Sequence, residues 1–429
     1  MLLELPALVK IIAVFVFILV LSRYKISLYI CLFSAAAAAG LWMGQGPVET
    51  ARLVLVKSLS GESLWLAVII VEIIVLSHLL KESRQMERIV DTFKAISFGN
   101  RFTLACLPAI IGLLPMPGGA LFSAPMVESS AAGSGLSAEL KTAINYWFRH
   151  VWEYWWPLYP GMILAISLLN VKPWQLIAAQ FPLCLGVLIS GNIFLLSACP
   201  KKKSNTTPSR KDVKRFLYEI IPFGLVIFAM FGLDFIIDYI RLPFAWPKYL
   251  NFLIGLILAQ GWVIKTNNLP ALLIKKALFH RFTLDMALII LGIMAFKGVL
   301  IETHMIGEIQ EELIRYHIPT VFVVAALPFI SGLVMGIAIG FVGSSYPLII
   351  VLLNGQIQGA EMLAYSTLAY GFGYMGMMMS PVHLCLLVSK DYFHADLAGT
   401  YKLLIKPMVF VLIWTVFLFM VYKTAFAMW

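Results

Sequence analysis

Long apolar runs alternate with short polar stretches along nearly the whole chain. The first apolar runs cover residues 5–21, 27–43 and 64–80, and a similar series starts again after residue 216. A helix of about 20 apolar residues is long enough to cross the hydrocarbon core of a bilayer. The pattern therefore predicts an all-α polytopic membrane protein with about ten transmembrane helices.

The second half of the chain repeats landmarks of the first half. A shift of 220 residues places Pro108 on Pro328 and Gly112 on Gly332, and other prolines and glycines coincide after small gaps. Internal repeats of this kind are typical of secondary transporters. We therefore expect a first repeat at residues 1–199, a linker at 200–216 and a second repeat at 217–429.

The charges of equivalent loops indicate that the two repeats are inverted. Loop 81–101 carries five Lys or Arg residues, whereas its counterpart, loop 301–318, carries one. The linker adds seven more basic residues. Because cytoplasmic loops collect Lys and Arg, loop 81–101 and the linker are expected in the cytoplasm and both termini outside it.

Two segments rich in proline and glycine interrupt the helical pattern at matching places in the two repeats. Each indicates a re-entrant helical hairpin, one within residues 102–135 and one within 319–353, with turns near 116–119 and 340–345. The N-terminus of a half-helix presents unpaired N–H groups and a positive dipole to an anion, and broken ends can coordinate Na⁺. Close helix packing through small residues is the alternative interpretation.

Ionisable side chains stand in the apolar run at residues 143–169. Such groups are costly in a membrane and mark functional sites by default. Arg149 is suited to bind a carboxylate with two hydrogen bonds, and His150 or Glu153 could carry a coupling proton. Alternatively, Arg149 and Glu153 form a structural pair at the interface and the neighbouring aromatic residues form a headgroup belt.

These patterns define two sets of candidate residues. The candidates for substrate binding are Pro117, Gly118, Gly119, Ser123, Asn145, Arg149, Gly343, Ser344, Ser345, Thr367 and Ser380. The candidates for ion or proton coupling are His150, Glu153, Tyr154 and His383.

Composition excludes several classes of protein. Of the 429 residues, 61% are hydrophobic and 13% are charged, which rules out an ordinary soluble enzyme or a disordered chain. The net charge of +10 comes from loop residues, so it indicates topology rather than a nucleic-acid partner. The five scattered cysteines, the lack of a P-loop and the lack of an HExxH motif predict no metal site, no ATP-driven pump and no resident cofactor.

Two long strings carry a resemblance to a known family. LLPMPGGALFSAPMVE and NYWFRHVWEYWWPLYPG resemble the prokaryotic integral membrane proteins called domain of unknown function 401. That family is grouped in the ion-transporter superfamily with gluconate, lactate and citrate permeases. The resemblance implies inverted repeats, re-entrant hairpins and an elevator-type transporter of the prokaryotic cytoplasmic membrane, often dimeric, but no substrate.

The sequence thus favours a secondary active transporter, and not an enzyme, that moves a small organic anion such as a carboxylate or sugar acid. H⁺ or Na⁺ would be the coupling ion. A cation/proton exchanger is the first alternative. A membrane-embedded enzyme acting on a lipid-linked substrate is the second, and it would place His150 and Glu153 at the membrane surface.

Overall fold

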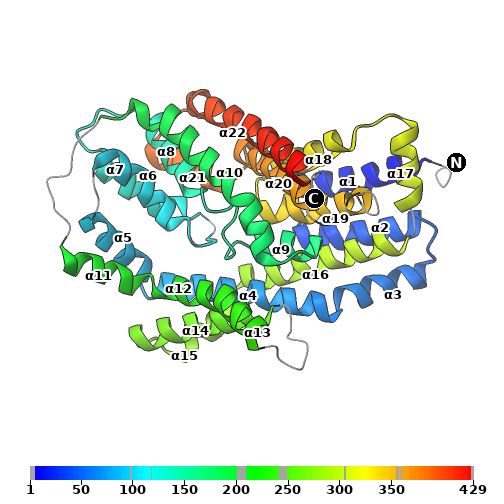
Figure 1. Ribbon diagram of the computed structural model, residues 1–429, viewed down its shortest axis with the longest axis horizontal. Helices are drawn as coiled ribbons and strands as arrows, with labels where there is room; N and C mark the ends of the chain where they lie inside the picture. The colour runs from blue at the N-terminus through cyan, green and yellow to red at the C-terminus, as the bar shows by residue number, and fades with distance from the viewer. Residues whose placement is uncertain are drawn as a thin grey trace.

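A computed structural model of the chain is built of α-helices joined by short connections (Figure 1). It describes residues 5–96, 99–116, 118–200, 209–240, 249–303, 306–353, 357, 359 and 361–426. The candidate Pro117 and most of the expected linker, residues 201–208, lie outside the described residues.

The helices of the first half lead from the N-terminal region to the linker. They are α1 (Ala7–Arg23), α2 (Leu28–Trp42), α3 (Pro47–Ser58), α4 (Gly61–Glu82), α5 (Gln85–Ile96), α6 (Asn100–Ile111), α7 (Ala120–Ala131), α8 (Ala138–Arg149), α9 (Pro160–Leu169) and α10 (Pro173–Phe194).

The helices of the second half follow the linker. They are α11 (Arg210–Glu219), α12 (Ile221–Ile227), α13 (Leu233–Ile240), α14 (Leu250–Asn267), α15 (Ala271–Leu278), α16 (Arg281–Glu302), α17 (Ile306–Arg315), α18 (Thr320–Met335), α19 (Ala338–Leu353), α20 (Glu361–Met379), α21 (Leu384–Phe393) and α22 (Leu397–Phe426).

Helix length and hydropathy make this a multi-pass membrane protein. Five helical segments among the described residues are long and apolar enough to cross a bilayer: Gly61–Glu82, Pro173–Ala198, Arg281–Glu302, Glu361–Phe393 and Leu397–Ala425. The number rises to seven if two bent helix pairs, with bends of 55° and 110°, each count as one span. Several other apolar helices, such as α2 and α9, have only 15 and 10 residues.

The order of helix lengths and breaks is similar in the two halves. Helices α4 and α16 both have 22 residues, and each is followed by a short amphipathic helix, α5 or α17. Next come a helix pair (α6 and α7, or α18 and α19), then a broken helix (α8 and α9, or α20 and α21), and finally a long helix, α10 or α22.

Each expected hairpin is a pair of contacting helices joined by a short turn. The first turn lies between Ile111 and Ala120, which includes the expected positions 116–119. The second turn was expected at residues 340–345, and that prediction is wrong, because these residues belong to α19. The chain turns instead at Gly336, whose φ of +65° is the same as that of Gly118 in the first turn and is readily adopted only by glycine.

The broken helices end earlier than their prolines suggest. Helix α8 stops at Arg149, and turns occupy residues 150–159 before α9 starts at Pro160. Proline suits that place, since the first residue of a helix needs no N–H partner. Helix α20 stops at Met379, just before Ser380-Pro381, and α21 starts at Leu384.

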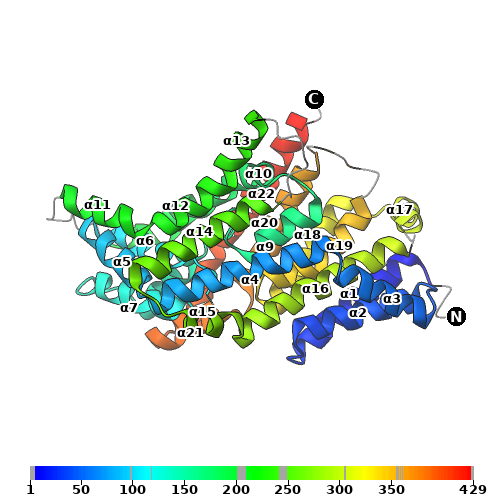
Figure 2. The ribbon, with the colours of Figure 1, turned by 90° about the horizontal axis from the view of Figure 1, so that it is seen from below.

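The first and second halves interlock around the middle of the molecule (Figures 1 and 2). Helices α5, α6, α7 and α11 gather at one end, and α1, α2, α3 and α17 gather at the other. Helix α16 packs against α2, α3 and α4, while α21 packs against α7 and α8. Helices from the two halves therefore contact each other, and the broken helices α8 and α21 are among them.

A glycine in α6–α7 allows the hairpin to lie directly against the end of α8. A Cβ atom at Gly112 would lie 2.0 Å from the backbone oxygen of Arg149. Because the obstacle is backbone, Gly112→Ala is expected to force the two segments apart, at the ~1–3 kcal/mol typical of overpacking. Thermal unfolding in detergent should then occur several degrees lower. Gly224→Ala is the control, since no atom outside its own helix lies within 4 Å of its Cβ position. Equal melting temperatures of the two variants would contradict the close contact at Gly112.

Candidate functional site

Both hairpin turns and both helix breaks meet at one cavity of about 190 Å³. The first turn contributes Pro115, Met116 and Gly118, and the second contributes Gly336 and Ile337. The remaining described lining residues come from the two broken helices, from α16 and from the start of α19: Arg149, His150, Glu153, Tyr159, Pro160, Gly161, Phe282, Met286, Ala338, Ile339, Met377, His383, Leu384 and Cys385. Every irregular backbone segment of the two repeats that the sequence singled out thus reaches the same place.

Arg149 is the permanent positive charge of this cavity. It is the last residue of α8, and only 2% of its surface is exposed. Its Nη2 donates to the carbonyl oxygen of Met116 at 3.0 Å, and its Nη1 lies 3.6 Å from Oε1 of Glu153. Its Nε has no hydrogen-bond partner among the described residues. A buried guanidinium with an unused donor can bind an anion that enters the cavity.

Glu153 is the negative charge beside Arg149. Its carboxylate is about nine-tenths buried and also lies 3.8 Å from Nε2 of His150. Glu153 comes four residues after Arg149, a spacing that would put both on one face of a helix, but α8 ends at Arg149 and Glu153 lies in the turns that follow. The charge pair is therefore held by a helix break rather than by a helix face.

Tyrosine hydroxyls satisfy backbone carbonyls that the breaks leave without helical partners. Tyr370 donates to the carbonyl of Glu153 at 2.9 Å, and Tyr374 donates to that of His150 at 3.2 Å. Tyr159 donates in the same way to Gly112 in the first hairpin, and Tyr146 to Met378 near the end of α20. Three of these bonds join the two halves, and the bond from Tyr159 lies within the first half. Together they make irregular backbone possible in a buried place.

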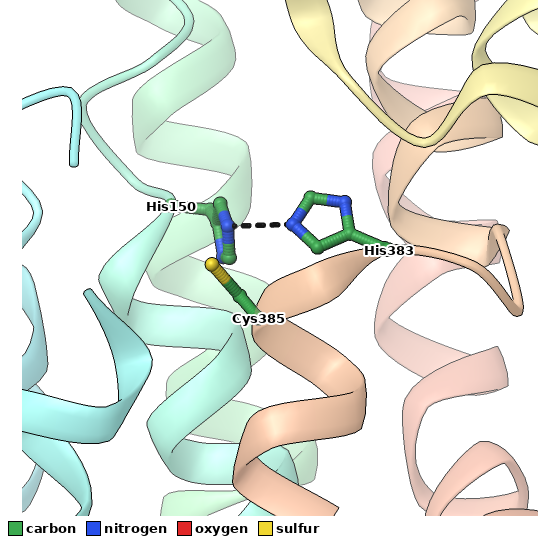
Figure 3. Close-up of side chains that lie close together, drawn as sticks. All are labelled: His150, His383 and Cys385. Atoms are coloured by element: carbon green, nitrogen blue, oxygen red, sulfur yellow. Dashed lines mark hydrogen bonds between the residues drawn. The ribbon is translucent and has the colours of Figure 1, made fainter. Parts of the chain in front are cut away.

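His150 and His383 face each other across the two breaks (Figure 3). Their Nε2 atoms are 3.1 Å apart, and Nδ1 of His150 lies 2.6 Å from the carbonyl oxygen of Tyr146. Because a carbonyl only accepts, His150 carries its proton on Nδ1 and its Nε2 accepts from Nε2–H of His383. Both rings are then neutral, and Nδ1 of His383 is left without a partner among the described residues.

His150, His383 and Cys385 are also of the types that bind transition metals, and their ligand atoms lie within 4.8 Å of one another (Figure 3). A metal-binding histidine nearly always donates its other N–H to an acceptor. Nδ1 of His383 makes no well-aligned hydrogen bond among the described residues, although the backbone carbonyl of Met377 lies close to the ring. The positive Arg149 nearby disfavours a cation further. The arrangement therefore suits a hydrogen-bonded pair of neutral imidazoles better than a metal centre.

The structure brings together five of the candidate residues at the cavity: Gly118, Arg149, His150, Glu153 and His383. Gly119 lies behind Arg149, because a Cβ at Gly119 would lie 2.2 Å from Nη2 of Arg149. Ser380 lies beside the second turn, with its Oγ 3.0 Å from the Cβ position of Gly336. Tyr154 packs against Tyr374, with ring centres 4.1 Å apart, and does not line the cavity.

Other candidates lie away from the lining and use their polar atoms within the protein. Ser123 donates to Oδ1 of Asn145 at 2.6 Å, and Nδ2 of Asn145 donates to Ser389 at 2.8 Å, which joins α7, α8 and α21. The hydroxyls of Ser344, Ser345 and Thr367 each donate to a carbonyl four residues earlier in the same helix, and Gly343 packs against Ile293.

A smaller cavity of about 60 Å³ adjoins the first. The two share Pro115, Met116 and Phe282, and the smaller one is also lined by His78 and Lys81. Nζ of Lys81 lies 5.3 Å from the ring centre of Phe122, and His78 packs against His280 with ring centres 4.6 Å apart. Basic side chains therefore lie beside the central cavity at the end of α4 and the start of α16.

Two comparisons with known proteins bear on the chain. A family model described as a protein of unknown function (DUF401) matches residues 4–422. No curated protein matches the chain.

Proposed function

The chain belongs to the DUF401 family, and from the geometry of its central cavity we propose that it is a secondary active transporter for a small organic anion. The observation that carries the proposal is Arg149: a buried guanidinium with one unused donor, at a cavity where two hairpin turns and two helix breaks converge. Close helix packing, or an aromatic belt at the lipid headgroups, would not require the two turns and the two breaks to converge on one cavity.

The charge of the site favours an anion over a cation. Arg149 remains protonated at any physiological pH, so a cation entering the cavity would be repelled unless Glu153 neutralised the guanidinium first. An anion can instead pair with the guanidinium group of Arg149, which lines the cavity. Lys81, which lines the adjoining cavity, adds to the attraction at one approach to the site. These features support the organic-anion transporter over the cation/proton exchanger.

Protonation of Glu153 would be linked to binding of the anion through the charge balance of the cavity. With both imidazoles neutral, Arg149 and Glu153 give the described lining a net charge of zero. An anion alone would add an uncompensated negative charge to a buried place, which is costly. Protonation of Glu153 frees Arg149 to pair with the anion and keeps the site neutral. The titratable neighbours of Glu153 in the cavity are His150, His383, Cys385 and Tyr159.

The proposed mechanism uses the two hairpins as parts of an inverted repeat. The parallel order of helices in the two halves and the matching turns at Gly118 and Gly336 support this arrangement. The hairpins and broken helices would form a transport domain that moves against a scaffold, with the cavity at its centre. Each hairpin would enter the membrane and leave it on the same side. Its irregular backbone would then lie at the cavity rather than against lipid.

Uptake into proteoliposomes tests the proposal. Purified protein should accumulate a labelled small carboxylate when an inward proton gradient is imposed, and a protonophore should abolish the accumulation. A parallel series with an inward Na⁺ gradient at equal pH identifies the coupling ion. Sodium-induced current or proton movement without any organic anion would support the exchanger instead. The absence of binding and uptake across a panel of organic anions would refute the proposed function.

A further inference from the structure

The lining of the central cavity is mostly apolar, and this restricts the kind of anion that fits. The side chains of Met116, Phe282, Met286, Ile337, Met377 and Leu384 surround the charged group. They come from the first hairpin turn, α16, the second hairpin turn and the second broken helix. An anion held at Arg149 therefore has its remaining atoms against hydrocarbon and thioether groups, which favour an apolar body.

Apart from Nε of Arg149 and Nδ1 of His383, the buried side-chain nitrogen and oxygen atoms of the described lining have hydrogen-bond partners. The hydroxyl of Tyr159 donates to Gly112, and His150 and His383 bond to each other. A substrate with several hydroxyl groups would lose its bonds to water and find few new partners, which is unfavourable for each group. The lining thus discriminates against polyhydroxylated acids.

The count of positive charges limits the number of carboxylates. Arg149 is the single Lys or Arg among the described lining residues, and Glu153 already lies beside it. A second or third carboxylate on the same substrate would remain unpaired in a buried environment, at a high electrostatic cost.

The volume of the central cavity limits the size of the anion that it can hold. An apolar cavity of about 150 Å³ is known to hold one benzene molecule of six non-hydrogen atoms. At about 190 Å³, the cavity has room for about six to eight non-hydrogen atoms on the same scale. This number corresponds to a linear monocarboxylate of about four to six carbons. A six-carbon sugar acid and a tricarboxylate with six carbons are larger than this range.

We infer that the site selects a short-chain monocarboxylate with an unsubstituted apolar chain, in preference to sugar acids and to di- and tricarboxylates. This inference rests on the proposed function and narrows its substrate class. The carboxylate pairs with the guanidinium group of Arg149, and the chain extends toward Met286 and Met377.

Equilibrium binding to the purified full-length protein tests the inference. We expect acetate, propionate, butyrate and pentanoate to bind with affinity that rises about four-fold per methylene, the factor given by burial of one CH₂. The increase should level off near hexanoate, because the cavity is partly open and further methylene groups extend beyond its lining. Gluconate, succinate and citrate should bind at least about ten-fold more weakly than butyrate, since each leaves buried polar groups unpaired.

A pair of methionine variants on α16 locates the chain-binding region. Met286 lines the cavity, whereas Met294, which is buried on the same helix, is not among the described lining residues. Met286→Ala should shift the preferred chain length upward by one or two carbons, and Met294→Ala should leave it unchanged. If both variants unfold, the binding series with carboxylates of increasing chain length in the wild-type protein still tests the inference.

The outcomes separate this inference from the proposed function. If gluconate, succinate or citrate binds more tightly than butyrate, or if affinity does not depend on chain length, the inference is wrong while anion transport stands. If no carboxylate of any kind binds, both are wrong.

Discussion

Replacement of Arg149 by glutamine should reduce anion uptake by about 100-fold or more, because the substrate loses a charge-assisted bond of roughly 3 kcal/mol. Arg149 supplies the single permanent positive charge of the described lining, and its Nε is unused. No other residue of the described lining carries a permanent positive charge. Uptake of labelled butyrate into proteoliposomes, normalised to the amount of reconstituted protein, measures the effect.

The variant needs two controls, because Arg149 also balances Glu153. Removing one partner of a buried pair destabilises a protein by about 3–5 kcal/mol. The double variant with Arg149→Gln and Glu153→Gln keeps the cavity neutral and should fold, yet it should not bind the anion. Arg52→Gln removes an arginine that is 69% exposed and should transport normally. Wild-type uptake by the folded double variant would exclude Arg149 as the anion receptor.

Replacement of Glu153 by glutamine should separate proton coupling from anion binding. Glutamine resembles the protonated carboxyl group, so Arg149 stays free to bind the anion. We expect exchange of labelled for unlabelled anion across the membrane to continue at roughly the wild-type rate. Accumulation driven by an imposed proton gradient should disappear, since no proton can be released from this position. The two assays use the same proteoliposomes and differ only in the imposed gradient.

Glu139→Gln is the matched control for this experiment. Glu139 lies at the start of α8, outside the cavity lining. Its substitution should leave both exchange and accumulation intact. Proton-driven accumulation by Glu153→Gln at the wild-type level would show that the coupling proton is bound elsewhere, with the paired imidazoles of His150 and His383 as the next groups to test.

The sequence predicted the membrane class and the first hairpin turn, but it misplaced the second turn. Glycine has two uses that look alike in a sequence: at Gly336 it adopts a φ of +65°, whereas at Gly343 it lets α19 approach Ile293. The first segment was simpler, because prolines flank its turn glycines and leave one position for the break. In the second segment four glycines lie between two prolines, and each is a possible position for the turn. The sequence does not show which of them the packing of the helices selects.

The charged residues of the site could be predicted from the sequence, and its apolar residues could not. Arg149, His150 and Glu153 are costly in an apolar run, which is a strong signal of function. Met286 and Cys385 carry no such signal, since apolar residues are expected everywhere in a membrane helix. Small polar residues gave the opposite error. Ser345 and Thr367 are not among the described residues that line the central cavity, because each hydroxyl bonds to a carbonyl of the preceding turn of its own helix.

The central claim is that the cavity binds one small organic anion at Arg149, and direct binding tests it without any assumption about coupling or direction. The measurement is equilibrium binding of labelled butyrate to purified wild-type protein and to the folded Arg149→Gln, Glu153→Gln double variant. We expect saturable binding to one site per chain in the wild type, displaced by pentanoate, and none in the variant. Equal binding by both proteins, or no binding of any carboxylate by the wild type, would contradict the claim.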